Sequence, residues 1–163
     1  MNWENIGFSQ LPSPCYVIDC DILKERLETL KKNCDYLNLK PLLAMKGFPL
    51  AILYKEMAPY LYGISASGLF EAHLGGHMGK EVHIHAPAYR PEEMQEVLTR
   101  CDHIVFNSIG QWMQYRDVVA TAPRSPSVGL RVNPEYSEIV VSKYDPCRPY
   151  SRFGVTKDLL IQQ

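Results

Sequence analysis

Apolar and polar residues follow two alternating rhythms along the chain. Short apolar runs that are typical of strands occur at residues 15–19, 41–46, 62–67, 82–86, 103–107 and 127–133. Between these runs, apolar residues recur at helical spacing at about 22–33, 50–60, 71–74, 91–100 and 111–120. The alternation of the two patterns predicts parallel β–α units, and therefore a fold of the α/β class.

The number of predicted strands restricts the architecture. Counted from Leu42, the chain supplies five parallel strands, whereas a closed (β/α)8 barrel needs eight strands and about 250 residues. Two arrangements remain open, a doubly wound open sheet and an incomplete barrel. Because the chain ends at residue 163 soon after a short helix begins near Thr156, we favour the incomplete barrel. No linker divides the chain, so residues 1–163 are predicted to form part of one barrel domain.

Local signals place the first helix and the last loop. Asp21 precedes the periodic segment 22–33 and is the predicted N-cap, and Leu23, Leu27 and Leu30 share one face of that helix. The polar, proline-containing segment 135–151 is predicted to be a loop.

Composition excludes several classes of partner. Of the 163 residues, 46% are hydrophobic and 21% are charged, which is typical of one globular domain. The net charge of -1, without a basic block, gives no basis for binding nucleic acid or a membrane surface. No apolar run approaches the roughly 20 residues of a membrane span. Residues 1–10 lack the pattern of a secretory signal, so we expect a cytoplasmic protein whose five cysteines are free thiols.

Lys46 is the most informative polar residue. It stands at the end of an apolar strand and precedes Gly47, and parallel sheets place their active sites at this end of their strands. An amine among apolar neighbours has a lowered pKa and can form a Schiff base with an aldehyde. From position alone, a lysine that merely extends to solvent is the more common case.

A family resemblance supports the interpretation of Lys46 as a Schiff-base lysine. Six blocks of sequence resemble, in order, those of the carboxynorspermidine decarboxylases, which are pyridoxal-phosphate enzymes of the alanine-racemase-like fold. The blocks are residues 11–17, 43–48, 79–83 with 86–89, 102–108, 130–137, and 144–147 with 151–154. The resemblance covers nearly the whole chain from Leu11 to Gly154.

The resemblance implies a function and a domain organisation. Enzymes of this family decarboxylate carboxynorspermidine to norspermidine and carboxyspermidine to spermidine, and they assemble their active sites across a homodimer. The resemblance also implies that this chain is the N-terminal part of the cofactor-binding barrel, without the C-terminal β-domain. Lys46 is implied to bind pyridoxal phosphate covalently, and Glu71 and Arg131 are implied to lie near the cofactor.

Other polar residues are weaker candidates. Ser65 and Ser67 could approach the cofactor ring, although capping of the following helix is the simpler interpretation. His83 and His85 share one face of a strand, and His85 is nearer to its carboxyl end. Because no third ligand is evident near this pair, we predict a sheet face and no metal site.

The remaining candidates concern substrate and phosphate. Glu135 and Tyr136 follow the Arg131 strand and are candidates for substrate contact, and Glu135 and Glu138 are candidates for binding the cationic polyamine. Gly75 and Gly76 are the only paired glycines, but they fall inside a helical segment, so the phosphate-binding residues stay unassigned.

Two alternatives stay open at this stage. The first is another pyridoxal-phosphate decarboxylase or racemase on the same scaffold. The second is a non-catalytic protein that carries the cofactor or assists assembly. In either case, an incomplete barrel would expose two sheet edges and an apolar interior, which predicts poor behaviour as a monomer.

Overall fold

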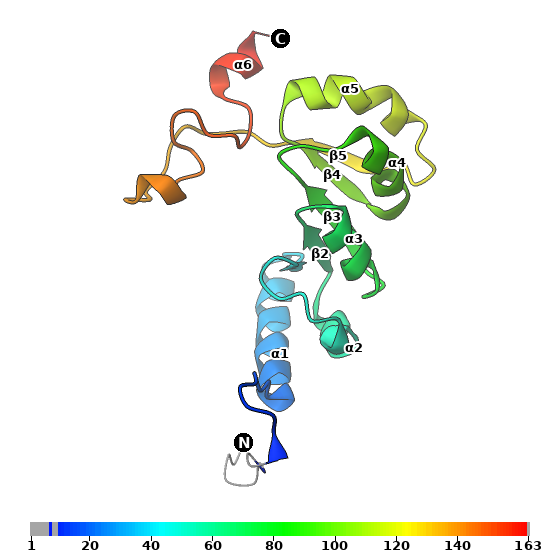
Figure 1. The fold of residues 1–163 in the computed structure, drawn as a ribbon, viewed down its shortest axis with the longest axis vertical. Coiled ribbons are helices and arrows are strands. Elements are labelled where there is room, and N and C mark those ends of the chain that lie inside the picture. The colour runs from blue at the N-terminus through cyan, green and yellow to red at the C-terminus, as the bar shows by residue number, and fades with distance from the viewer. Residues whose placement is uncertain (1–6, 8–9, 163) are drawn as a thin grey trace.

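The protein forms a parallel sheet of five strands with helices packed against it (Figure 1). The structure, a computed structural model, describes residue 7 and residues 10–162. The strands are β1 (Leu42–Ala44), β2 (Gly63–Ala66), β3 (Glu81–His85), β4 (His103–Phe106) and β5 (Ser127–Leu130). The helices are α1 (Cys20–Tyr36), α2 (Tyr54–Met57), α3 (Leu69–Gly76), α4 (Pro91–Arg100), α5 (Ile109–Ala120) and α6 (Lys157–Ile161). Short 3-10 helices occupy Ala51–Leu53, Ala58–Tyr60 and Ser142–Tyr144.

The strand order separates the two predicted arrangements. All five strands are parallel and lie in sequence order, β1 to β5. In a sheet whose strands are added in one direction, right-handed crossovers bring every connecting helix to the same face, as in a β/α barrel. In a doubly wound sheet the direction of strand addition reverses once, so helices cover both faces. Beyond β5, Val132 forms a parallel bridge with Val155, so the pairing continues in the same direction. The fold is therefore α/β with the sequential topology of β/α barrels.

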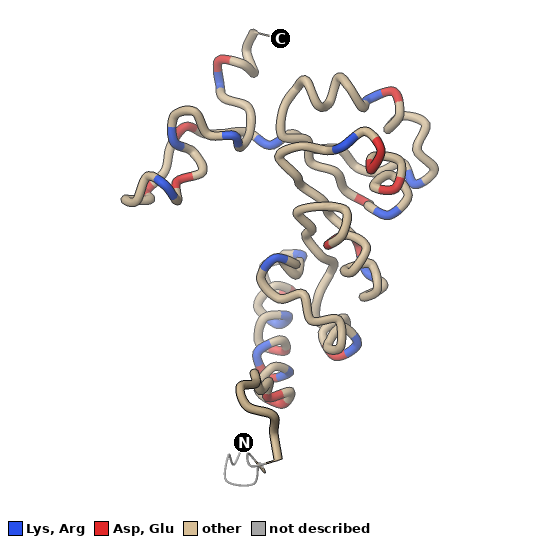
Figure 2. The backbone as a smooth tube through the Cα atoms, viewed as in Figure 1, with Lys and Arg blue, Asp and Glu red and all other residues tan. Residues whose placement is uncertain are grey.

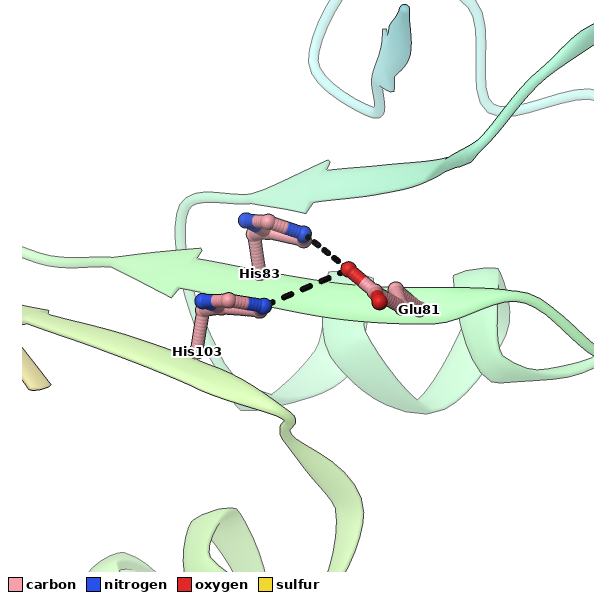
Figure 3. Close-up of side chains that lie close together, drawn as sticks. All are labelled: Glu81, His83 and His103. Carbon is pink, nitrogen blue, oxygen red and sulfur yellow. Dashed lines mark hydrogen bonds and ion pairs between the residues drawn. The ribbon is translucent and has the colours of Figure 1, made fainter. Parts of the chain in front are cut away.

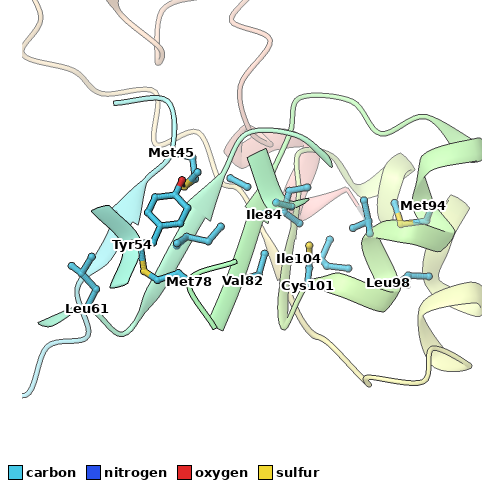
Figure 4. Close-up of a cluster of buried hydrophobic side chains, with 14 of the residues drawn as sticks. Met45, Tyr54, Leu61, Met78, Val82, Ile84, Met94, Leu98, Cys101 and Ile104 are labelled. Carbon is cyan, nitrogen blue, oxygen red and sulfur yellow. The ribbon is translucent and has the colours of Figure 1, made fainter. Parts of the chain in front are cut away.

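The core lies between the sheet and its helices, and the buried helix residues come from α1 to α5 (Figure 4). Alternate strand residues face these helices and are almost fully buried, namely Ile64, Val82, Ile84, Ile104 and Phe106. Met94, Val97 and Leu98 of α4 pack against them. Full burial of each such side chain stabilises the fold by roughly 1.5–3 kcal/mol.

Gly75 sets the distance between α3 and the sheet. A Cβ atom at this position would lie 2.7 Å from Cγ1 of Ile64 and 3.2 Å from Sδ of Met45. Only glycine allows the helix to approach β2 so closely. The paired glycines therefore lie inside a helix, as predicted, and Gly75 serves packing.

The opposite face of the sheet is mainly polar. The register places Ser65, His83, His103 and Ser127 side by side on this face, and the alternation adds Glu81 and His85. Leu42 and Val105 are the only large apolar side chains that the five described strands place there. The prediction of an exposed apolar interior is therefore wrong, because most side chains on this face are polar or small.

Several local predictions also need correction. Residues 15–19 form no strand, since no neighbouring strand pairs with them, and all but the half-buried Asp19 are exposed. Asp19, not Asp21, caps α1, and its Oδ1 accepts hydrogen bonds from the N–H groups of Asp21 (2.9 Å) and Ile22 (3.0 Å). The helix predicted at 50–60 is divided into α2 and two 3-10 helices, and Pro59 at the start of the second one removes a backbone donor.

The remaining observations concern charge, thiols and membranes. Acidic and basic residues are interspersed along the described residues (Figure 2). All five cysteines are free, as predicted. None of the described helices has the length and apolar character required to span a bilayer. We predicted from residues 1–10 that the chain has no secretory signal. Of these residues the structure describes only 7 and 10, so the others lie outside the described part.

Candidate functional site

Polar residues gather at the carboxyl edge of the sheet. Lys46 lies in the turn after β1, Ser67 directly follows β2, and His85 is the last residue of β3. Asn107 and Arg131 directly follow β4 and β5. Because the strands are parallel, these five positions lie at the same edge, where α/β proteins bind ligands.

Lys46 is exposed rather than buried among apolar neighbours as we predicted. The reason is its position, because β1 is an edge strand of only three residues and the turn carries the side chain past the helix-covered face. The charge of Lys46 is one of the smaller contributions that lower the pKa of His85. Lys46 forms no ion pair with any described residue.

His85 lies at the centre of this group. Its Nε2 atom is buried and has no hydrogen-bond partner among the described residues. Burial lowers the pKa of His85, and the charges of Arg131 and Lys46 lower it further, while a contact with Asn107 favours the charged form. The imidazole is therefore neutral at neutral pH and has an unused polar atom beside two cations.

Arg131 approaches His85 from β5. Its guanidinium carbon lies 4.5 Å from the centroid of the Phe153 ring, a cation–π contact that leaves the N–H groups free to bind an anion. No described carboxylate forms an ion pair with Arg131. Gly154 passes close by at φ +82°, and a Cβ there would lie 3.2 Å from Cγ of Arg131.

Asn107 is a residue that the sequence analysis missed. It is buried, and its Nδ2 donates to the carbonyl of Arg152 (2.7 Å) while its Oδ1 accepts from the N–H of Gly154 (2.9 Å). These two hydrogen bonds attach the segment 152–154, which contains Phe153, to the end of β4. The signal was available in the sequence, because Asn107 follows its strand as directly as Arg131 follows β5.

The sequence analysis also missed the structural role of Tyr89. Its hydroxyl donates to the carbonyl of Val105 (3.0 Å) and accepts from the N–H of Ala86 (3.2 Å), and Tyr115 donates to the Tyr89 carbonyl (3.0 Å). Burial raises the pKa of the Tyr89 phenol above its usual range. Tyr89 therefore stays protonated and links the ends of β3 and β4 beside His85.

Glu71 and Ser67 interact through the start of α3. Oε2 of Glu71 accepts a hydrogen bond from the N–H of Ser67 (2.7 Å), and Gly68 is the N-cap residue. The prediction that the hydroxyl of Ser65 or Ser67 caps this helix is wrong, because the Glu71 side chain binds the backbone instead. The Ser67 side chain is exposed at the carboxyl edge.

Glu135 and Tyr136 are engaged in local contacts. Oε2 of Glu135 accepts from the N–H of Lys157 (3.2 Å), and the Tyr136 hydroxyl donates to Oε1 of Glu138 (3.0 Å). Glu135 also lines a cleft of about 330 Å³ between residues 133–135 and 147–151. No hydrogen bond or ion pair joins either side chain to Lys46.

A second polar group lies nearer the amino edge of the same face (Figure 3). Oε2 of Glu81 is 3.0 Å from Nε2 of His83 and 3.2 Å from Nε2 of His103. Partial burial raises the pKa of Glu81, but the hydrogen bonds of His83 and Tyr62 and the charges of the histidines together lower it below its usual value. The prediction that His83 has no further potential ligand nearby is therefore wrong.

Comparison with known proteins identifies relatives of the whole described fold. No family model matches the chain. The carboxyaminopropylagmatine decarboxylase of Synechocystis sp. is 39% identical over 158 residues, which are 96% of this chain and 40% of that protein. The carboxynorspermidine/carboxyspermidine decarboxylase of Campylobacter jejuni is 34% identical over 149 residues, which are 91% of this chain and 38% of that protein.

A solved structure agrees with these matches. The crystal structure of carboxynorspermidine decarboxylase complexed with norspermidine from Campylobacter jejuni aligns with a TM-score of 0.77 at 33% identity, covering 90% of this chain and 36% of that one. The chain thus spans about two fifths of the length of its curated relatives. Over nearly all of its residues it is related to the carboxynorspermidine and carboxyspermidine decarboxylases, as the sequence blocks indicate.

Proposed function

We propose that this chain supplies part of the active site of a decarboxylase in polyamine biosynthesis that uses pyridoxal phosphate. The observation that carries the proposal is the position of Lys46, His85 and Arg131 at the carboxyl ends of three parallel strands of one sheet. The names of the related proteins support a carboxylated polyamine as substrate.

The residues at this edge fit the cofactor. The Lys46 amine would bond to its aldehyde, and the unpartnered Nε2 of His85 would meet its ring. Arg131, whose only described partner is the Phe153 ring, would balance negative charge. When bound, pyridoxal phosphate supplies an electron sink for the electron pair left as the substrate carboxylate departs as carbon dioxide.

The surrounding residues keep this edge in place. His85 is neutral, so it can accept or donate one hydrogen bond without adding a third charge beside Lys46 and Arg131. Glu71 is held by the N–H of Ser67, which fixes the start of α3 next to β2. We assign Ser67 and Glu71 to the wall of the cofactor site.

Two classes of substrate are favoured by different relatives. Carboxynorspermidine, with carboxyspermidine, is favoured by two relatives and by the norspermidine complex of the solved structure. Carboxyaminopropylagmatine is favoured by the relative that is 39% identical. In both cases a cationic tail must be bound, and the exposed carboxylates of Glu135 and Glu138, with Tyr136 between them, are the proposed contacts.

The proposal includes an assembly. We place residues 1–163 in the leading part of a cofactor-binding (β/α)8 barrel, followed by a C-terminal β-domain in a cytoplasmic homodimer. The supporting observations are the sequential strand order and the 40% coverage of the first relative.

The test is spectroscopic first and enzymatic second. We expect pyridoxal phosphate to give the purified protein a visible absorption band, and Lys46→Ala to lose it. Lys55→Ala is the control, because Lys55 is an exposed lysine on α2. A band that persists in Lys46→Ala would refute the assignment of Lys46.

Substrate turnover separates the remaining alternatives. Carbon dioxide release by the intact enzyme that contains this chain is measured with carboxynorspermidine, carboxyspermidine, carboxyaminopropylagmatine and a panel of amino acids. We expect release from a carboxylated polyamine. Release from an amino acid alone would indicate another decarboxylase of this fold, and a normal absorption band without any release would indicate a cofactor carrier.

A further inference from the structure

Three potential metal ligands share the polar face of the sheet below the carboxyl edge. Glu81 and His83 are two residues apart on β3, and His103 is the register partner of His83 on β4, so all three project from one face. Their nearest ligand atoms, one from each side chain, lie within 4.8 Å of one another (Figure 3).

The sheet leaves room around these ligands. Across the strands, the residues level with His83 and His103 are Ala44, Ser65 and Ser127, all of them small. The ligand side chains are between one quarter and just over one third exposed. In this chain an ion with a bound water can therefore reach them, whereas in the complete barrel proposed above this face would line the closed interior.

We propose that Glu81, His83 and His103 form a binding site for a divalent transition-metal ion, with zinc as the best fit. Two imidazoles and one carboxylate are ordinary zinc ligands, and a tetrahedral ion with bonds of 2.0–2.2 Å holds its ligand atoms about 3.3 Å apart. The two N–O separations of 3.0 and 3.2 Å are close to this spacing. The fourth position is left to water.

Binding requires one ring to turn. The His83 and His103 rings are stacked, with centroids 4.0 Å apart and planes 10° from parallel. A metal ion lies in the plane of each imidazole that binds it, and one ion cannot lie in two parallel planes. The His103 ring must therefore rotate about its Cβ–Cγ bond, and its partial exposure permits this. Loss of the stacking is a specific consequence of binding.

The test measures zinc binding without pyridoxal phosphate or substrate, so its outcome is independent of the proposed activity. Calorimetric titration of the purified protein with Zn²⁺ should give one ion per chain, and His103→Gln and Glu81→Gln should each weaken binding at least tenfold. His73→Gln is the matched control, because His73 and His77 form an exposed histidine pair on and next to α3 with ring centroids 5.6 Å apart.

Two further measurements keep the result decisive if a variant folds poorly. Co²⁺ in place of Zn²⁺ should give the intense visible bands of a four-coordinate site, and Zn²⁺ should shift the ring NMR signals of His83 and His103 but not those of His73. Equal affinity in the protein and in His103→Gln, or unchanged His83 and His103 signals at saturating Zn²⁺, would overturn the proposal.

Discussion

Removal of the Asn107 side chain should loosen the segment that supports Arg131. Asn107 is 8% exposed, and its amide makes two hydrogen bonds to backbone groups 45 and 47 residues away. Asn107→Ala deletes both and leaves the carbonyl of Arg152 and the N–H of Gly154 without their partners. The segment carries Phe153, on which the Arg131 guanidinium rests.

The size of the effect follows from the two lost bonds. A buried backbone group left without a partner costs about 1–3 kcal/mol. Arg152 is exposed and Gly154 only half-buried, so water can replace part of each lost bond and the lower limit applies. We expect Asn107→Ala to lower the free energy of opening this segment by about 2 kcal/mol, which is about a 30-fold change in the opening equilibrium.

Hydrogen exchange at the Gly154 amide measures this opening directly. We expect about 30-fold faster exchange in Asn107→Ala. The matched control is Asn133→Ala, which removes another buried asparagine but only a local bond from the N–H of Glu135 (2.9 Å). The reasoning is refuted if Gly154 exchanges at the same rate in Asn107→Ala as in the unsubstituted protein, or equally fast in both variants.

Three further predictions concern conformation, thiol reactivity and packing. Gly154→Ala should lower the stability by about 1–3 kcal/mol in urea unfolding, because φ is +82° and the new Cβ would lie 2.8 Å from a backbone nitrogen, whereas Gly110→Ala in α5 should be neutral or slightly stabilising. Burial, with the charge of a neighbouring aspartate, raises the pKa of the Cys101 thiol to about 12, so mass spectrometry should show no alkylation of Cys101 at pH 8 in the native protein and full alkylation in denaturant. Leu98→Ala should cost about 2–5 kcal/mol by calorimetry, and Leu159→Ala on exposed α6 less than about 0.5 kcal/mol.

The sequence predicted the repeating part of the fold well, and the physical reason is local. Strands β2 to β4 and helices α3 to α5 each carry a hydrophobic pattern of one period and are found within a residue or two of their predicted positions, whereas β5 begins as predicted but ends three residues early, at Leu130. The run at 15–19 has the same pattern, but a strand exists only where a neighbour supplies hydrogen bonds. That condition depends on tertiary structure, which a local pattern does not contain.

The sequence analysis named candidate residues that lie at strand ends, but it missed a contact between side chains on neighbouring strands. Lys46 and His85 were singled out by their places at strand ends and Arg131 by the family resemblance; the exposure of Lys46 was not foreseen, and the roles of all three stay predictions. The contact of His83 with His103 joins residues 20 positions apart, and it exists only through the register of β3 with β4. No spacing along the chain marks such a pair.

The alternation along β3 gives this one strand two separate chemical roles. Glu81, His83 and His85 project from the same face, and a rise of about 3.3 Å per residue separates successive members by about 6.6 Å along the strand. His85 therefore lies at the carboxyl ends of the strands with Lys46, while His83 and Glu81 lie nearer the amino ends. His85 is not among the residues whose ligand atoms lie within 4.8 Å of one another, so an ion bound to Glu81, His83 and His103 leaves His85 unoccupied. Lys46→Ala should then leave Zn²⁺ binding intact, and His103→Gln should leave the pyridoxal-phosphate absorption band intact. If either substitution removed both signals, the two groups of residues would act as one site and the separation derived from the strand geometry would be wrong.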